Sequence, residues 1–100
     1  MIRHLVSFSL NPETIPAPAQ DHLTQIKEQL EALPEQIPQL VSLEVDINRN
    51  PAEAPAFILN AVTQNYQDLA AYAAHPAHVA VVKALIAPYK TARVCIDSEF

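Results

Sequence analysis

Hydrophobic and polar residues alternate in four segments of the chain, which is the pattern of β-strands that bury one face. The four segments are residues 2–10, 40–48, 57–63 and 93–100. The apolar face of the first segment also carries a histidine and consists of Ile2, His4, Val6 and Phe8. The corresponding face of the second segment consists of Val41, Leu43, Val45 and Ile47. In the last segment, Val94, Ile96 and Ser98 lie opposite Arg93, Cys95, Asp97 and Glu99.

Two other segments carry apolar residues at every third or fourth position, which predicts amphipathic helices. The first helix is expected from Pro18 to Leu33. The second is expected to begin near Tyr66, because the side chain of Asn65 can cap it. Pro76 lacks an N–H and must interrupt this helix, so we expect a second helical piece from about Pro76 to Ala87.

The predicted order is β-α-β-β-α-β, which indicates an α+β protein of the ferredoxin-like type. In this arrangement the helices cover one face of a four-stranded antiparallel sheet and leave the other face bare. The apolar residues of segment 40–48 are too many for a sheet face left in water. We therefore expect a homodimer in which two copies pack through the sheet face.

Composition narrows the possible partners. The 100 residues predict a single domain over 1–100, and the formal charge of −5 without a basic cluster argues against nucleic acid. No segment approaches the roughly 20 apolar residues of a membrane span, and the first residues are too polar for us to expect a signal peptide. A single cysteine suits a cytoplasmic protein. The chain has no glycine, which excludes glycine-rich nucleotide loops.

The residues with chemical potential are Tyr72, His78, His4 and His75. His78 shares a predicted helix face with Val81 and Leu85, so its ring should face the sheet, and the break at Pro76 can bring Tyr72 close to it. His4 can face the same cavity. A phenol and imidazoles in an apolar chamber suit proton transfer at a carbonyl compound near neutral pH.

Structural roles for the same residues remain open. His78 can be a hydrogen-bonded core residue, His75 can cap the helix at Pro76, and Tyr72 can be an amphipathic core residue. Asp97 and Glu99 can form ion pairs with Arg93, and Cys95 reads as a packed thiol. A three-histidine metal site is the weaker alternative, since no carboxylate is placed to orient the rings. We expect neither a metal nor another cofactor.

Several segments resemble the stress-responsive dimeric α/β-barrel (Dabb) family in the order typical of that family. They are Ile2–Phe8, Leu33–Asn48, Asp68–His78 and Arg93–Glu99. The motif Tyr-x-x-His-Pro-x-His at Tyr72–His78 is the most specific of them. Gln39 and Asp46 stand where the family usually has glycine. The resemblance implies a ferredoxin-like monomer that pairs with a second copy into an α/β barrel.

The resemblance also bears on function. Plant polyketide cyclases of the olivetolic acid type look like Dabb proteins and use a Tyr and a His of this segment in an aldol-type ring closure, and Tyr72 and His78 match these positions. One hypothesis is thus a cyclase- or lyase-like acid–base enzyme for a carbonyl or polyketide-like compound, with Tyr72 and His78 catalytic and His4 and His75 binding the ligand. The alternatives are a non-catalytic binder of a small apolar ligand and a structural stress-response protein.

Overall fold

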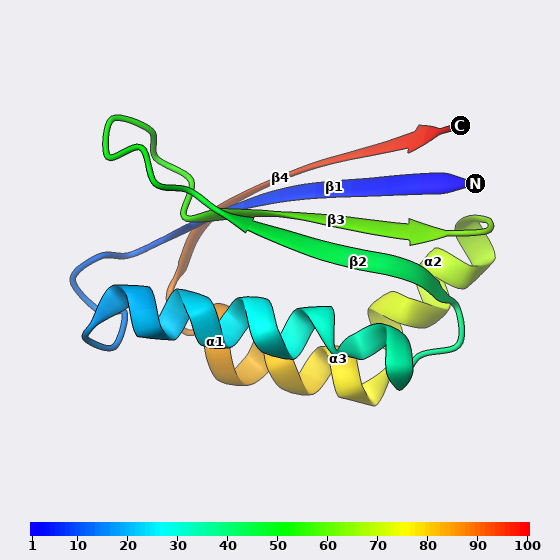
Figure 1. The fold of residues 1–100 in the computed structure, drawn as a ribbon, viewed down its shortest axis with the longest axis horizontal. Coiled ribbons are helices and arrows are strands. Elements are labelled where there is room, and N and C mark those ends of the chain that lie inside the picture. The colour runs from blue at the N-terminus through cyan, green and yellow to red at the C-terminus, as the bar shows by residue number, and fades with distance from the viewer.

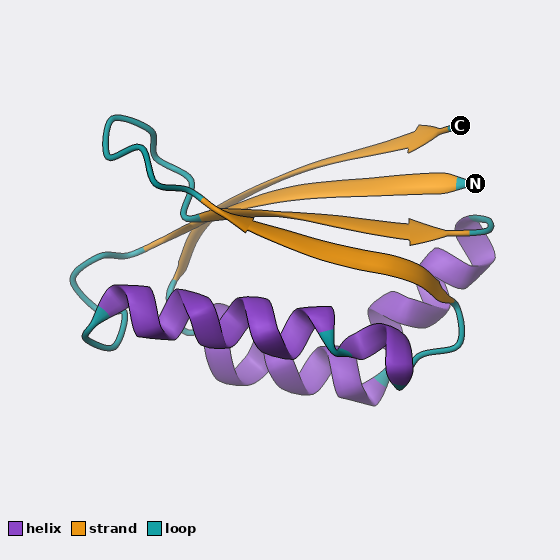
Figure 2. Cartoon of the chain, viewed as in Figure 1, coloured by secondary structure: helices purple, strands orange, loops and turns teal.

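A computed structural model describes all residues from 1 to 100 and contains one antiparallel sheet with the strand order β2-β3-β1-β4. The strands are β1 (Ile2–Leu10), β2 (Leu40–Ile47), β3 (Phe57–Thr63) and β4 (Lys90–Glu99). The helices are α1 (Ala19–Glu31), α2 (Tyr66–Ala74) and α3 (Pro76–Val81), with the short 3₁₀ turn η1 (Leu33–Glu35) and the π-helical turn η2 (Val82–Ile86). All helices lie on one side of the sheet (Figure 1), which gives the two layers seen in Figure 2. The predicted ferredoxin-like fold is confirmed.

The boundaries of the broken second helix follow from its caps. The side chain of Asn65 accepts a hydrogen bond from the amide of Asp68 at 2.8 Å and starts α2. The backbone at His75 is extended, which ends α2 and places Pro76 in the first turn of α3. The predicted interruption at Pro76 is therefore confirmed.

The core lies between the helices and the inner face of the sheet. The stripe of α1 that faces the sheet is fully buried, with Ile26 and Leu30 both 0% exposed. Val6 and Phe8 of β1 are also buried, as their alternation predicts, while His4 on the same face is half-buried. The outer face of the sheet has no helix over it.

The prediction that Val41 shares one face of β2 with Leu43 and Val45 is wrong. This changes which residues form the outer face of the sheet. The register of β2 against β3 shifts between Leu40 and Ser42, so Val41 is an extra residue outside the alternation and is 47% exposed. Leu43 and Val45 pack beneath the helices, and Ile47 also contacts the core. The apolar residues of this strand consequently do not form the bare face of the sheet.

The bare face instead receives its apolar residues from the other three strands. They are Leu5 of β1, Ile58 and Val62 of β3, and Val94 and Ile96 of β4. Val94 and Ile96 are 63% and 62% exposed. The alternation predicted for segment 93–100 is correct, but β4 begins earlier, at Lys90, because a register shift after Ser9 lets Lys90 pair with Leu10.

The loops are built without a left-handed residue. No residue has positive φ, in keeping with the absence of glycine. In the connection between β2 and β3, the side-chain amide of Asn48 donates hydrogen bonds to the carbonyls of Asn50, Glu53 and Pro55. Side-chain hydrogen bonds thus close this turn.

None of the individual helices combines the length and the apolar composition needed to cross a membrane. Taken together, α2 and the helical stretch Pro76–Ile86 meet both criteria, but they are bent by 51° at their junction.

Candidate functional site

A cavity of about 390 Å³ lies between the sheet and the helices α2, α3 and η2. Fifteen residues line it, and eleven of them are hydrophobic. The other four are His4, His78, Lys90 and Arg93. A largely apolar cavity of this size with a few polar groups is typical of a small-molecule site.

Tyr72 and His78 meet at this cavity from two sides of the Pro76 break. Tyr72 of α2 is 1% exposed, and its ring centroid lies 4.4 Å from that of His78 of α3. The Tyr72 hydroxyl is buried and has no hydrogen-bond partner. Burial raises the pKa of this hydroxyl well above its usual value, so it is a neutral donor. An unpaired buried donor is costly, and a ligand oxygen would satisfy it.

The hydrogen bond of His78 identifies its neutral tautomer. Its Nδ1 lies 3.0 Å from the carbonyl oxygen of Ala73. A carbonyl only accepts, so Nδ1 must donate, and Nε2 carries the free lone pair of a base. Burial lowers the pKa of His78, against a smaller opposite effect of the Ala73 carbonyl. His78 is therefore neutral near pH 7 and able to accept a proton.

His4 is joined to a carboxylate. Its Nδ1 donates to Oδ1 of Asp97, which faces it directly on β4, at 2.5 Å. This hydrogen bond holds the pKa of the Asp97 carboxyl below its usual value. The ring of His4 stands edge-on to that of Tyr72, with centroids 6.4 Å apart. The structure thus brings His4, Tyr72 and His78 to one cavity.

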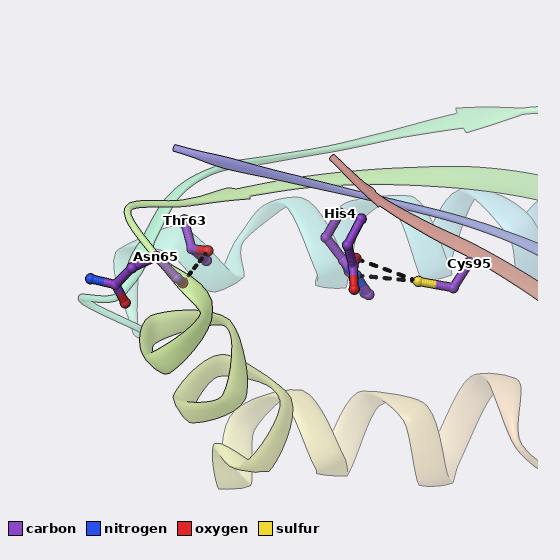
Figure 3. Close-up of polar contacts among 5 residues, drawn as sticks. His4, Thr63, Asn65 and Cys95 are labelled. Carbon is purple, nitrogen blue, oxygen red and sulfur yellow. Dashed lines mark hydrogen bonds and ion pairs between the residues drawn. The ribbon is translucent and has the colours of Figure 1, made fainter. Parts of the chain in front are cut away.

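Cys95 completes a small cluster with His4 and Asp97. Its Sγ lies 3.5 Å from Nδ1 of His4 and 3.6 Å from Oδ1 of Asp97. Figure 3 shows the side chains of His4 and Cys95 on the helix-facing side of the sheet, from neighbouring strands. Burial and the charge of Asp97 raise the pKa of the Cys95 thiol, which makes it a poor nucleophile at neutral pH.

The same cluster contains the donor atoms of a metal ligand set. One donor atom of each residue lies within 4.8 Å of the others, and nitrogen, sulfur and oxygen ligands together suit Zn²⁺. Two tetrahedral zinc ligands at the usual bond lengths, however, are about 3.3 Å apart. The distance of 2.5 Å between His4 and Asp97 fits a direct hydrogen bond instead.

His75 does not join the cavity. Its Nδ1 accepts a hydrogen bond from the amide of Ala77 at 3.1 Å, and it is not among the lining residues. The predicted capping role of this residue is therefore confirmed. The three-histidine arrangement considered from the sequence would require His75 to leave the helix that it caps.

The fourth histidine, His22 of α1, also lies on an inward helix face, but its role is structural. It is 6% exposed, and its Nε2 donates to the carbonyl of Leu85 at 2.8 Å. Leu85 lies at the end of a helix, where carbonyls lack partners within the helix, and the rings of His22 and Tyr89 pack nearly perpendicular to each other. His22 is thus engaged in the core and takes no part in the cavity.

Sequence reasoning did not foresee two features of the site. Asp97 orients His4, although no carboxylate was expected beside a histidine, and Arg93 and Lys90 line the cavity. The alternation places Arg93, Cys95 and Asp97 on one face of the last strand. In a ferredoxin-like sheet the first and last strands are neighbours, so matching the inner faces of β1 and β4 could have revealed the pair.

Residues 2–100 match the family described as the Stress responsive A/B Barrel Domain, abbreviated Dabb. Comparison with the curated proteins gives no match. Among solved structures, a dimeric protein of unknown function with a ferredoxin-like fold from Bacteroides fragilis is 36% identical, with a TM-score of 0.89. The match covers 99% of this chain and 95% of that one.

Two further structures extend the comparison. A dimeric ferredoxin-like protein of unknown function from Thermobifida fusca is 28% identical over 99% of this chain and 90% of its own, with a TM-score of 0.79. The hydroxynitrile lyase of Passiflora edulis has a TM-score of 0.76, covers 97% of this chain and 90% of its own, and is 15% identical. At that identity the lyase shares the fold alone.

Proposed function

Because the chain belongs to the stress-responsive A/B barrel domain (Dabb) family, we propose that it is a homodimer whose cavity binds a small carbonyl compound and catalyses proton transfer beside the carbonyl. The observation that carries the proposal is the unpaired hydroxyl of Tyr72, whose ring packs against the His78 imidazole in an apolar cavity. The proposed location is the cytoplasm, where a free Cys95 thiol remains reduced.

The proposed chemistry uses one proton acceptor and one hydrogen-bond donor. Nε2 of His78 takes the proton from the carbon next to the carbonyl, and the C–H electron pair moves to give an enolate. The Tyr72 hydroxyl donates to the enolate oxygen, where charge develops. In a molecule with a second carbonyl, the enolate carbon attacks that carbonyl carbon and the new alkoxide takes the proton back from His78. The result is an aldol-type ring closure without a net change in protons.

His4 is proposed to hold the ligand and Asp97 to position His4. With Nδ1 of His4 donating to Asp97, its Nε2 is left free for a hydrogen bond with the ligand. We assign no ligand contact to His75, since its Nδ1 caps α3.

Hydrogen–deuterium exchange tests the first half of the reaction. Methyl ketones and diketones are incubated in D₂O with the protein, and loss of the proton beside the carbonyl is followed by NMR against a buffer blank. We expect exchange with the wild type and little with Tyr72→Phe or His78→Gln. Tyr89→Phe and His75→Gln are the matched controls, because neither residue lines the cavity. Equal exchange in all five proteins would contradict the proposal.

A non-catalytic binder is the second candidate, favoured by the apolar lining of the cavity. Under this alternative, ketones protect the protein from thermal unfolding but exchange no faster than in buffer. If ketones neither bind nor exchange, a purely structural stress-response protein is the remaining candidate.

The proposed dimer uses the bare face of the sheet. This face carries Val94 and Ile96, and the side-chain oxygen of Asn60 on the same face is buried without a partner. Related structures are described as dimeric. A stable interface of about 1,600 Å² in total is expected. Ile96→Lys should shift sedimentation toward the monomer, whereas Val79→Lys, on the exposed side of α3, should not.

A further inference from the structure

The charged residues of the cavity all have the same sign. Lys90 and Arg93 are two of only six Lys and Arg residues in a protein of net charge −5. No Asp or Glu lines the cavity. The ion pairs of the protein are His4 with Asp97 and Lys27 with Glu31, so neither Lys90 nor Arg93 is paired with a carboxylate. An acidic protein has thus placed two cations at its cavity, neither of them in an ion pair, although the charge of Arg93 also acts on Asp97.

Both cations come from the first half of β4 and lie where the cavity meets solvent, since both residues are exposed. Arg93 faces Phe8 across the strand pair, with its guanidinium carbon 6.0 Å from the centre of the Phe8 ring. His4 precedes Phe8 by four residues on β1, which corresponds to about 13 Å along the strand. The backbone positions of the cations and of His4 therefore lie toward different ends of the lining, and the charge of Arg93 still acts on the Tyr72 hydroxyl.

We infer that the cavity takes a ligand with an apolar body, a carbonyl at one end and a carboxylate at the other. The carboxylate lies at Lys90 and Arg93, and the carbonyl lies at Tyr72 and His78; this assignment rests on the proposed function. A guanidinium matches a carboxylate in a bidentate fashion, and an ammonium adds a second cation. Apolar walls next to the cations strengthen the attraction relative to open water.

The test compares a ten-carbon carboxylic acid that has a ketone next to its terminal methyl group with the methyl ester of the same compound. Binding to the full protein is measured by isothermal titration calorimetry at low salt. We expect the keto acid to bind about tenfold more tightly than the ester, and added salt to reduce this preference. Arg93→Gln and Lys90→Gln should each remove most of the preference, measured as the ratio of the two affinities.

Lys83→Gln is the matched control, because Lys83 is exposed on η2 and does not line the cavity. Melting curves confirm that each variant is folded. Equal binding of acid and ester to the wild type overturns the inference and leaves the proposed function standing. Equal loss of acid binding in Lys83→Gln and Arg93→Gln also overturns it, since the effect would then come from net charge. If neither compound binds, the proposed function fails as well.

Discussion

The two halves of the sheet are covered by helices in different ways. Over β2, the helix α1 packs an unbroken apolar stripe against the strand, and Lys27 and Glu31 bind the backbone of Val45 at the sheet edge. Over β1 and β4, the broken pair α2 and α3 leaves a cavity lined by His4 and His78. The half at β2 is tightly packed, whereas the half at β1 and β4 contains polar groups and a cavity. Stability and chemistry are thus divided between two sides of one sheet.

Two histidines illustrate the same division: His22 is buried, and His78 is half-buried. His22 donates to a helix carbonyl and is satisfied within the core. His78 has one nitrogen engaged by the Ala73 carbonyl, while its ring lies against the ring of Tyr72, whose hydroxyl is unpaired. Both residues lie on inward helix faces, so periodicity alone does not distinguish them. What distinguishes His78 from His22 is that its neighbour Tyr72 has a hydroxyl without a hydrogen-bond partner.

The largest expected difference between the two halves is the loss of unfolding free energy when one leucine in each half is replaced by alanine. Leu30→Ala removes a side chain that is 0% exposed from the packed half and should cost about 2–5 kcal/mol of unfolding free energy. Leu69→Ala removes a half-buried side chain that already borders the cavity, and it should cost less than half as much. Urea unfolding of both variants measures the difference. Equal losses would contradict the division between a packed half and an open half.

Tyr72→Phe separates function from stability within the open half. The hydroxyl has no partner, so its removal should leave the melting temperature unchanged or raise it slightly, unlike the loss expected for an ordinary hydrogen bond of about 1 kcal/mol. Proton exchange of ketones should fall by a factor of about 100. Thermal unfolding and the NMR exchange assay are carried out on the same samples. A large drop in melting temperature with unchanged exchange would make Tyr72 a core residue only.

The pH dependence of the open half should be governed in part by His78. Its pKa is lowered in the folded protein, mainly by burial, so the unfolded chain binds a proton more readily. The contribution of His78 to stability is therefore complete above about pH 6.5 and decreases as the pH falls toward the folded pKa.

The pKa of the His78 ring should also lie below that of a free imidazole, so the ring stays neutral, and exchange active, at a lower pH than an exposed histidine would allow. NMR titration of the ring protons tests this. The titratable or charged neighbours of His78 are His4, His75, Tyr72 and Arg93. Because these groups can also affect the NMR signals, His78→Gln provides the reference curve. A midpoint at or above the value of a free imidazole would contradict the prediction.

Asp97→Asn should have the smallest effect, because the carboxylate acts through His4. We expect a decrease of a few-fold in exchange and a small decrease in stability at pH 7. The folded pKa of Asp97 is lowered, chiefly by the His4 hydrogen bond, so its stabilisation is present above the ordinary value of 3.8 and is lost as the pH falls below it. Wild type and variant should then converge in acid. Asp46→Asn, an exposed carboxylate outside the cavity, is the control.

Local patterns predicted most of the fold. The caps at Asn65 and His75, the break at Pro76 and the faces of β1 and β4 depend on neighbouring residues, which the sequence displays directly. The exposed position of Val41 depends on a register shift between two strands, which no pattern within one strand reveals.

The site was predictable only in part for the same reason. Tyr72 and His78 are six positions apart on one broken helix, so their proximity follows from local geometry. His4 and Asp97 are separated by 93 positions, and their contact depends on how the first and last strands align. The unpaired state of the Tyr72 hydroxyl depends on the packing of every surrounding element.

The glycine-free backbone also affects the unfolded chain. An average domain of 100 residues contains about seven glycines. Here every residue carries a side-chain carbon or a ring that restricts the backbone, and nine prolines limit it further. A replacement of glycine by alanine at a compatible position typically stabilises a protein by about 0.4–1 kcal/mol, because the unfolded chain has fewer conformations to lose. With all its turns built from conformations that ordinary residues adopt, this protein gives up less conformational entropy on folding than its length implies.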